Sequence, residues 1–275
     1  MIIEQIVEQS IIDEIYSKKK LSSEEIIQLK PNEYIVLKSV TGSSAVLRYQ
    51  TKDYYKLVEP KTKIGKTTAN DLQQLCLMDS LLDDNIKIVS CIGPAGSGKS
   101  YLSLEYAVQA INASKELKLI CTKPTVAIGN DKYFGSVPGT VQDKFDIFLD
   151  SFYLTLSKLI PSEVWLQTLI EKERIQFSPI QFVRGNHWEN VLLVLDECQS
   201  LGWHELKSIL SRLGDGSKAI LLGDIKQKDK MANGFESLVN SRTYQESTLT
   251  SHIELEKDYR GPISRLISKI DEEIS

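Results

Sequence analysis

Apolar residues recur at helical spacing at the start of the chain. They stand at Ile2, Ile3, Ile6, Val7, Ile11, Ile12 and Ile15. Residues three and four apart share one face of a helix, so the pattern predicts an amphipathic helix over residues 2–16. Its apolar face could pack on its own domain or dock a partner. Ser22 and Glu25 have capping-box spacing, which predicts a short second helix that ends before Pro31.

The pattern changes in residues 33–58, where runs with a period of two are separated by turn residues. They predict strands over residues 34–39, 45–49 and 54–58, with a turn at residues 41–44. This is a small β module, too short to be a catalytic domain. Residues 59–69 contain Pro60, Gly65 and several Lys and Thr, a composition typical of a linker.

From about residue 70 onward, apolar strands alternate with helices. Strands are expected at 86–92, 117–122, 191–195, 219–222 and 252–255, and helices at 100–117, about 140–160, 205–213 and 261–274. Continuous apolar strands between helices are typical of an α/β domain whose parallel sheet is covered on both faces. The sequence therefore predicts two parts: residues 1–69, with the helices, the β module and the linker, and residues 70–275, the α/β domain.

A glycine-rich segment stands between the first of these strands and the helix that follows it. It contains Gly93, Pro94, Ala95, Gly96, Ser97, Gly98, Lys99 and Ser100, which fit G-x-x-x-x-G-K-[ST]. Glycines let backbone N–H groups turn inward around a polyphosphate, and the helix N-terminus adds its dipole. We therefore expect an ATP site, where Lys99 contacts the β- and γ-phosphate oxygens and Ser100 ligates Mg²⁺. Tyr101, the next residue, is included in the nucleotide-binding set.

Two carboxylates end the apolar strand at residues 191–195. Ligands bind at the carboxyl edge of open α/β sheets, so Asp196 is expected to hold Mg²⁺ through water. Glu197, one residue further on, is expected to point in a different direction from Asp196 and to polarise the attacking water. The adjacent pair favours hydrolysis over binding alone. Taken alone, such a pair is often just a helix N-terminus.

A further polar group follows the strand at residues 219–222. Gln227 comes shortly after Gly223 and Asp224, and its amide is suited to sensing the γ-phosphate or orienting water. The alternative is an ordinary turn after a strand.

With these motifs together, the chain resembles the PhoH-like family of ATPases, which are similar to one core of superfamily 1 helicases. The resemblance covers about residues 70–266. Further matching positions are Gln74, Asp79, residues 81–84, Thr122, Pro124, residues 135–139, Lys144, residues 182–185, Asp196, Glu197, Gln199, Arg212, Gly214, Ser217, Lys218 and Arg260. The chain departs from the family pattern at Lys123, Cys198 and Ser200.

The resemblance implies a RecA-like P-loop domain over residues 70–275. It also implies that Gln74 lies on the adenine side of the nucleotide, and that the work done with ATP is linked to RNA. Residues 1–69 resemble the connector that fused members carry between a PIN ribonuclease domain and the ATPase. The PIN domain is missing from this sequence, and residues 1–30 lack its separated carboxylates, so no nuclease activity is implied.

Three arginines are candidates for stabilising charge on the transferred phosphoryl group: Arg184, Arg212 and Arg260. Arg260 is preferred because it follows the last strand. Five lysines near Tyr54 and Tyr55 could contact nucleic-acid phosphates, or could belong to a solvated linker; they are Lys52, Lys56, Lys61, Lys63 and Lys66.

Composition limits the remaining possibilities. The 275 residues are 41% hydrophobic and 25% charged, as in an ordinary soluble protein, and the net charge of −4 means that nucleic-acid binding must rest on a local patch. The four widely spaced cysteines indicate buried thiols in a reducing compartment. The start of the chain does not resemble a signal peptide, and no stretch approaches a membrane span. We expect a cytoplasmic protein with no membrane contact.

The predicted reaction is hydrolysis of ATP to ADP and phosphate, with Lys99, Glu197, Gln227 and Arg260 as catalytic residues and ATP and Mg²⁺ as ligands. The reaction is expected to drive translocation on, or remodelling of, RNA or single-stranded DNA. An ATP-gated protein-interaction switch without nucleic acid remains open, and a small-molecule kinase is disfavoured because no acceptor pocket is recognisable.

A single RecA-like core leaves the γ-phosphate exposed, so we expect a homo-oligomeric ring, such as a hexamer, with Arg260 acting on a neighbour. The alternative is a monomer in which Arg260 acts on its own site.

Overall fold

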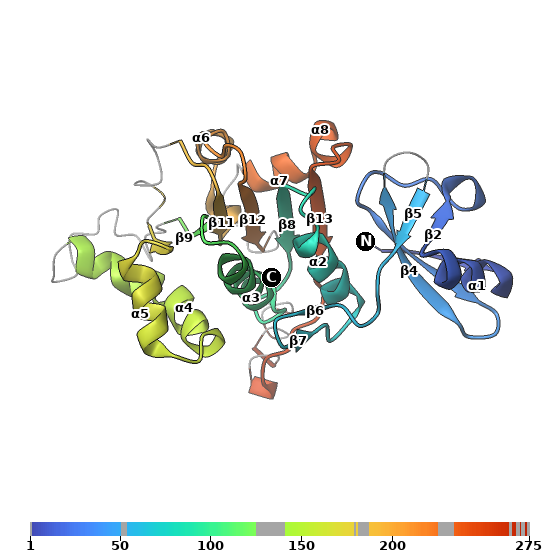
Figure 1. Ribbon diagram of the computed structural model, residues 1–275, viewed down its shortest axis with the longest axis horizontal. Helices are drawn as coiled ribbons and strands as arrows, with labels where there is room; N and C mark the ends of the chain where they lie inside the picture. The colour runs from blue at the N-terminus through green and yellow to red at the C-terminus, as the bar shows by residue number, and fades with distance from the viewer. Residues whose placement is uncertain are drawn as a thin grey trace.

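The computed structural model (Figure 1) describes residues 2–50, 54–124, 141–178, 180, 187–224, 234–263, 266–267, 270 and 273. For residues 25 and 141–149 the description is confined to the backbone. The N-terminal module, drawn in blue, lies at one end of the molecule, and helices α4 and α5 lie at the other. The α/β domain occupies the space between them.

The N-terminal module is a five-stranded sheet with one helix. Its elements are β1 (Ile3–Val7), α1 (Gln9–Lys18), β2 (Lys20–Ser22), a 3-10 turn η1 (Ser23–Glu25), β3 (Tyr34–Ser39), β4 (Ser44–Gln50) and β5 (Tyr54–Leu57). The strands are ordered β1-β3-β4-β5-β2. Ile12 and Ile15 of α1 are buried in a core with Ile35, Leu37 and Leu47. The predicted β module is confirmed, and it includes residues from the start of the chain.

The helix predicted over residues 2–16 is wrong in its first half. Ile3 to Val7 form a strand that pairs in parallel with β3, with Ile3 opposite Ile35. Helical spacing of β-branched residues is also compatible with a strand, and the neighbouring edge of β3 decides between them because it satisfies the backbone of β1. The helix begins only at Gln9.

Two further expectations for this region are corrected. The second helix is a single 3-10 turn, because residues 20–22 pair with β5 instead. The expected linker contains a hairpin of β6 (Lys63–Ile64) and β7 (Thr67–Thr68). Ile64 is fully buried in the core of the α/β domain, which holds the hairpin in place.

The α/β domain contains six parallel strands within the described residues. They are β8 (Ile88–Ile92), β9 (Lys118–Thr122), β10 (Ile175–Phe177), β11 (Val191–Leu195), β12 (Lys218–Gly223) and β13 (Thr250–Glu254), in the order β10-β9-β11-β12-β8-β13. All five neighbouring pairs are parallel. The predicted parallel sheet is confirmed, and β10 is a strand that the sequence pattern did not reveal.

Helices cover both faces of this sheet. They are α2 (Leu72–Leu82), α3 (Lys99–Ala113), α4 (Val141–Leu159), α5 (Glu163–Glu171), a 3-10 turn η3 (Cys198–Ser200), α6 (Trp203–Leu210), α7 (Gly234–Val239) and α8 (Arg242–Gln245). Alternate residues of β11 enter two cores: Leu192 and Val194 pack with α2 to α5, and Leu193 and Leu195 pack with α6 to α8. Half of the helix expected over residues 261–274 lies outside the described residues, and residues 262, 263, 266, 267, 270 and 273 have helical backbone.

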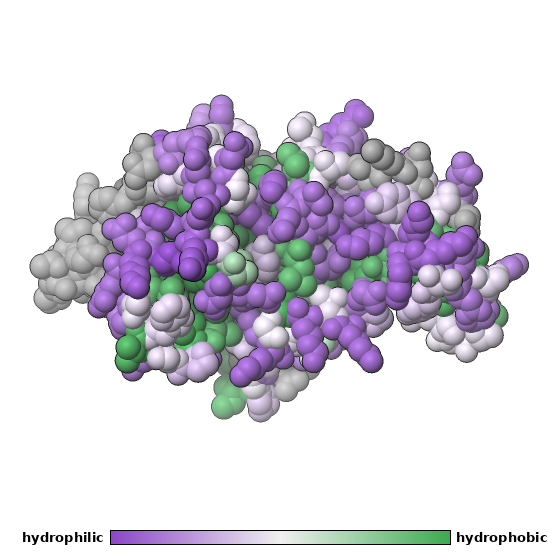
Figure 2. Space-filling view, viewed as in Figure 1, coloured by the Kyte–Doolittle hydropathy of each residue, from purple (hydrophilic) through white to green (hydrophobic). Residues whose placement is uncertain are grey.

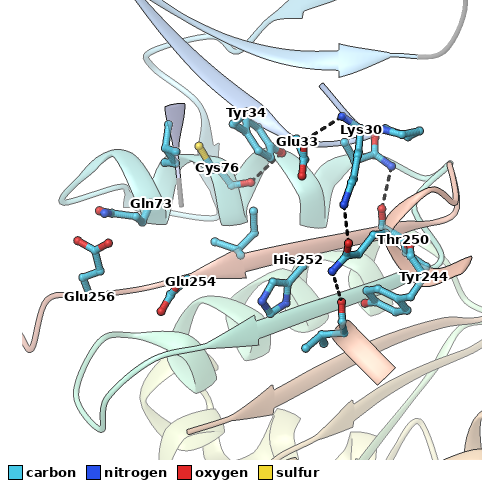
Figure 3. A pocket seen from close by; sticks show the side chains of 16 residues that line it. Lys30, Glu33, Tyr34, Gln73, Cys76, Tyr244, Thr250, His252, Glu254 and Glu256 are labelled. Atoms are coloured by element: carbon cyan, nitrogen blue, oxygen red, sulfur yellow. Dashed lines mark hydrogen bonds between the residues drawn. The ribbon is translucent and has the colours of Figure 1, made fainter. Parts of the chain in front are cut away.

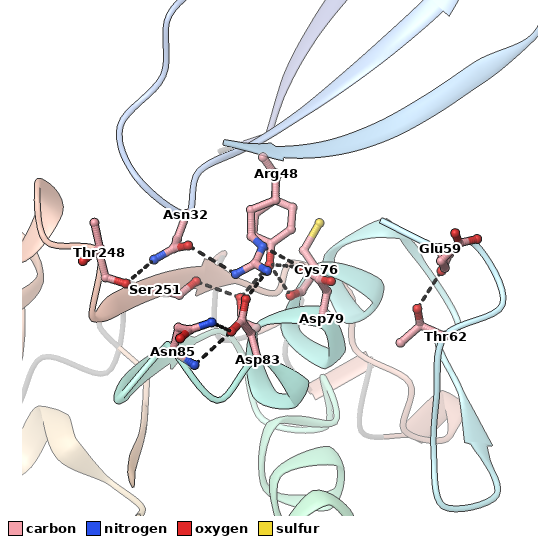
Figure 4. Close-up of polar contacts among 12 residues, drawn as sticks. Asn32, Arg48, Glu59, Thr62, Cys76, Asp79, Asp83, Asn85, Thr248 and Ser251 are labelled. Carbon is pink, nitrogen blue, oxygen red and sulfur yellow. Dashed lines mark hydrogen bonds and ion pairs between the residues drawn. The ribbon is translucent and has the colours of Figure 1, made fainter. Parts of the chain in front are cut away.

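A buried polar network joins the module to the α/β domain (Figure 4). Arg48 of β4 is fully buried and forms ion pairs with Asp79, over 2.9 Å, and with Asp83. Burial alone would raise the pKa of Asp83, but the hydrogen bond from Arg48 lowers it. Removing one partner of a buried ion pair leaves the other charge uncompensated, at a cost of about 3–5 kcal/mol. The network therefore fixes the module against α2.

All four cysteines are free and buried, as predicted, and burial raises the pKa of the Cys91 thiol to about 12. Hydrophilic residues spread over much of the face seen in Figure 2, with hydrophobic residues in patches between them. Within the described residues, none of the helices has the length and apolar character needed to cross a membrane.

Candidate nucleotide-binding site

The glycine-rich loop lies between β8 and α3 at the carboxyl edge of the sheet. Gly96 and Gly98 adopt φ angles of 82° and 95°, which favour glycine because it has no Cβ. Gly98 is the N-cap of α3 and supplies no side-chain cap, so backbone N–H groups at the helix start are free to meet a ligand. This is the geometry of an anion-binding loop.

Close packing explains the glycine at position 96. A Cβ there would lie 2.2 Å from Asp258 Oδ1 and 2.4 Å from Arg260 Cγ. The backbone N–H of Tyr259 also donates to the Gly96 carbonyl over 3.0 Å. The segment after β13 is therefore pressed against the loop of the same chain.

The two predicted motifs meet in the fold. The Ser100 hydroxyl donates to Asp196 Oδ2 over 2.8 Å, although the residues are 96 positions apart. Lys99 is buried, and its Nζ donates to the carbonyls of Gly93, over 2.5 Å, and Pro94, over 2.9 Å. The ammonium group is thus held across the loop, where phosphate oxygens would replace these carbonyls as acceptors.

A cleft of about 380 Å³ lies between these groups. Its lining residues are Ala95, Gly96, Gly98, Lys99, Ser100, Tyr101, Asp196, Glu197, Gly223 and Asp224. A hydroxyl and a carboxylate are the oxygen ligands that Mg²⁺ accepts, so Ser100 and Asp196 fit a magnesium site beside phosphate. Tyr101 is 42% exposed and stands at the edge of the cleft.

Gln199 has a place in the site that its sequence context alone did not predict. Its Nε2 donates to Glu197 Oε2 over 2.6 Å, and its Oε1 accepts the Asp224 N–H over 3.0 Å. Glu197 itself has a left-handed backbone, with φ of 56°, and lies where β11 ends. The buried amide of Gln199 therefore fixes the carboxylate relative to β12. Its only signal in the sequence is its place in the motif shared with the PhoH-like family.

Gln74 lies beneath the loop, with both ends of its amide occupied. Its Nε2 donates to the Ser97 carbonyl over 2.9 Å, and its Oε1 accepts the Asn70 N–H over 2.9 Å. Gln74 is only 3% exposed. In this arrangement it supports the P-loop, and its predicted contact with adenine stays a prediction.

Two of the candidate arginines are described. Arg260 lies beside the P-loop of its own chain and pairs with Asp258 over 3.1 Å. Arg212 donates to the Ser208 carbonyl at the end of α6, close to the residues that lead into β12, so it lies at the edge opposite the P-loop. Arg184, Gln227, Lys52, residues 135–139 and the side chain of Lys144 lie outside the described residues.

A second crevice lies between the N-terminal module on one side and β13 and α2 on the other (Figure 3). It is lined by Lys30, Glu33, Gln73, His252 and Glu254, among others, and measures about 200 Å³. Desolvation lowers the pKa of His252 to about 4, and its Nδ1 lies 2.8 Å from Ser90 Oγ. Lys99, Glu197 and Arg260, the predicted catalytic residues that the structure describes, do not line this crevice, so it is distinct from the P-loop cleft.

A parallel sheet with a P-loop, and with Ser100 and Asp196 facing each other at its carboxyl edge, defines a RecA-like P-loop NTPase. The family model described as "PhoH-like protein" matches residues 66–272. The chain belongs to the PhoH-like family.

Relatives differ from this chain in length. Protein PhoH2 of Thermobispora bispora is 29% identical over 238 residues, which cover 86% of this chain and 54% of the relative. A PhoH-like protein of Synechocystis is 39% identical over 142 residues, covering 52% of this chain and 42% of the relative. The chain thus spans about half the length of these relatives. Among solved structures, the Pif1 helicase from Candida albicans matches 74% of this chain and 43% of its own, with 17% identity and a TM-score of 0.38.

Proposed function

We propose that this chain hydrolyses ATP in a Mg²⁺-dependent reaction at the P-loop cleft. The observation that supports this best is the hydrogen bond between Ser100 and Asp196, which joins the two motifs where a metal ion and phosphates would meet. Mg²⁺ bound there supplies positive charge that offsets the charge of the phosphates. Lys99 contributes a second positive charge beside it.

Hydrolysis needs an activated water. The Glu197 carboxylate lines the cleft and is held by Gln199, so it is suited to accept a proton from water as the water oxygen attacks the γ-phosphorus. The bond from that phosphorus to the bridging oxygen then breaks, which yields ADP and phosphate. We assign water orientation also to Gln227, and charge stabilisation to Arg260, which lies beside the loop.

ATP turnover in this chain is proposed to drive movement on, or remodelling of, RNA or single-stranded DNA, as in a helicase. Membership of the PhoH-like family supports a link to nucleic acid. The alternative is an ATP-gated protein-interaction switch, which the acidic pI of 5.6 and the firmly docked module favour.

One experiment separates these two functions. The ATPase rate is measured with and without single-stranded RNA and DNA at two salt concentrations. We expect nucleic acid to raise the rate, and the increase to shrink at high salt, because phosphate contacts release counterions. An unchanged rate at both salt concentrations would favour the switch.

We also propose a homo-oligomeric ring. The cleft is open at one side, and a neighbouring subunit would exclude water from it. Because Arg260 already lies beside its own P-loop, we assign the arginine to the same chain rather than to the neighbour. The proposed arrangement differs from both expectations, because it combines a ring with an arginine that acts on the site of its own chain.

A further inference from the structure

A groove of about 660 Å³ runs beside α3, outside the P-loop cleft. One wall is the hairpin of β6 and β7, the floor is α3, and the other wall is the end of α4 with Pro161. Figure 1 shows α3 between the hairpin and α4. Tyr101 lines both the groove and the P-loop cleft, so the two sites meet at this ring.

The walls of the groove are basic. Lys63 and Lys66 come from the hairpin and Lys158 from the end of α4, and all three are exposed. None of them forms an ion pair with any residue in the described part of the chain. Among the described lining residues, Glu105 is the only acidic one, so they carry two more positive than negative charges in a chain of net charge −4. A ligand with several negative charges fits it.

The carboxylate of Glu105 is turned away from such a ligand. Its Oε1 accepts the Lys66 N–H over 3.1 Å, and its Oε2 is buried with no partner among the described residues. Gln109 Oε1 accepts the Gly65 N–H over 2.8 Å. A Cβ on Gly65, whose φ is 56°, would lie 2.7 Å from Glu105 Oε1. The turn of the hairpin is thus clamped to α3, and the lysines stand on a preformed wall.

The floor of the groove offers groups that bases can use. Tyr101 is an exposed ring, and Gln109 and Asn112 present exposed side-chain amides further along α3. Residues 101, 105, 109 and 112 are separated by three or four positions, so they share one face of the helix. Aromatic rings beside a basic groove are the usual means of binding single strands.

We propose that this groove binds a single strand of nucleic acid, with Lys63, Lys66 and Lys158 at its phosphates. An acidic peptide could satisfy the lysines, but it would leave the ring and the amides of the floor unused, so the single strand is favoured. Because Tyr101 directly follows Ser100, the strand and the ATP phosphates contact successive residues of one helix. The inference rests on the proposed function, since it names the place where the polymer binds.

The test compares two triple variants of the whole chain. The first carries Lys63→Glu, Lys66→Glu and Lys158→Glu. The control carries Lys115→Glu, Lys172→Glu and Lys207→Glu, which make the same charge change at exposed sites outside the groove. Binding of labelled oligo(U) and oligo(dT) of about 16 nucleotides is measured by fluorescence anisotropy over a range of salt. The basal ATPase rate without nucleic acid is measured in parallel.

We expect the groove variant to lose at least about tenfold in affinity relative to the control, with basal ATPase unchanged. Its slope of log affinity against log salt should be smaller by about two, since each phosphate contact to a single strand contributes about 0.7. The ratio of the wild-type affinities for oligo(U) and oligo(dT) shows whether the chain prefers RNA or DNA.

Three outcomes would contradict the inference in different ways. If the wild-type chain binds neither oligonucleotide, the nucleic-acid part of the proposed function fails. If it binds them and the groove variant matches the control, the polymer binds elsewhere and only the groove assignment is wrong. If polyglutamate competes as well as the oligonucleotide does, the groove is a site for acidic protein segments.

Discussion

The side-chain amide of Gln199 donates a hydrogen bond to the carboxylate of Glu197 over 2.6 Å, and accepts one from the backbone N–H of Asp224. A built Cβ on Gly223 would lie 2.9 Å from Gln199 Oε1, so the glycine makes room for this amide. The carbonyl of Gly223 in turn accepts the N–H of Gly93 at the start of the P-loop. Glu197 is therefore positioned by contacts that reach both β12 and the P-loop.

The first prediction separates ATP binding from chemistry at Glu197. Glu197→Gln should lower the rate of hydrolysis by about 10²-fold or more, because the amide cannot accept the water proton. ATP affinity should change little, since Lys99, Ser100 and Asp196 remain. Single-turnover rates and nucleotide titration measure the two effects, with the exposed Glu116→Gln as control. A collapse in affinity with an unchanged rate per bound ATP would make Glu197 a structural residue.

The second prediction concerns Gln199. Gln199→Glu places a second carboxylate beside Glu197, which disfavours the ionised form of both. The acid limb of the pH profile of kcat should move up by about one pH unit, with KM little changed. Gln199→Leu should lower kcat by about tenfold without moving that limb. If Gln199→Glu only lowers thermal stability and the pH profile stays in place, Gln199 does not position the carboxylate.

The third prediction is that Lys99→Ala abolishes ATP turnover. The change removes the positive charge expected at the β- and γ-phosphates. The fold should persist, because the hydrogen bonds of the Lys99 ammonium within the described part of the chain go to carbonyls of the loop itself. Circular dichroism and steady-state phosphate release test both parts. Turnover near the wild-type rate would place the nucleotide elsewhere.

The fourth prediction is an oligomer in which each site uses its own arginine. Light scattering with ATP and Mg²⁺ should give a mass several times 31.0 kDa. Mixing inactive Arg260→Ala with inactive Glu197→Gln subunits should restore no activity, because Arg260 lies beside its own P-loop. Recovery on mixing would assign the arginine to the neighbouring subunit. A monomeric mass during turnover would exclude the ring.

The fifth prediction concerns the pH dependence of stability through Lys218. Its Nζ donates to the carbonyls of Ser80, Leu81 and Asp83 at the end of α2, and desolvation lowers its pKa from 10.5 to about 8. Below pH 8 the group is charged in the folded and unfolded chain. Between pH 8 and 10.5 this lysine holds a proton more often in the unfolded chain than in the folded chain. The free energy of unfolding therefore increases as the pH rises through this range, by about 3 kcal/mol at most.

Urea unfolding at several pH values measures this effect. The slope of the unfolding free energy between pH 8 and 10.5 should fall in Lys218→Met, whereas the exposed control Lys207→Met should keep it. Equal slopes in all three proteins would mean that Lys218 titrates as an ordinary lysine.

Local sequence patterns were sufficient to predict the parallel strands and the P-loop of the α/β domain. The apolar strands at Ile88–Ile92, Val191–Leu195 and Lys218–Gly223 are each buried on both faces, so their composition alone marks them as parallel strands. The P-loop is equally local, because the glycines, the lysine and the serine of its pattern are adjacent in the chain. Its position between β8 and α3 is as predicted.

Local patterns failed where a distant partner decides the conformation. Ile3 to Val7 became a strand because the edge of β3 was available, and Ile64 anchors a hairpin because α2 and α3 cover it. Tyr55, which the sequence places among the lysines that could contact nucleic acid, is fully buried in the module. In each case the deciding contact is far away in sequence and leaves no local periodicity.

By itself, the sequence determined that the chain is a P-loop NTPase, and it predicted Lys99, Ser100, Asp196 and Glu197 as the chemical groups because these residue types stand in short, ordered motifs. Only the tertiary structure decided how they are supported. It brought Gln199 to Glu197, Gln74 under the loop, Arg260 beside Gly96, and Lys158 across α3 from Lys63 and Lys66. The physical reason is that hydrogen bonds and charge clusters act over a few ångströms in space, whereas sequence motifs report only neighbours along the chain.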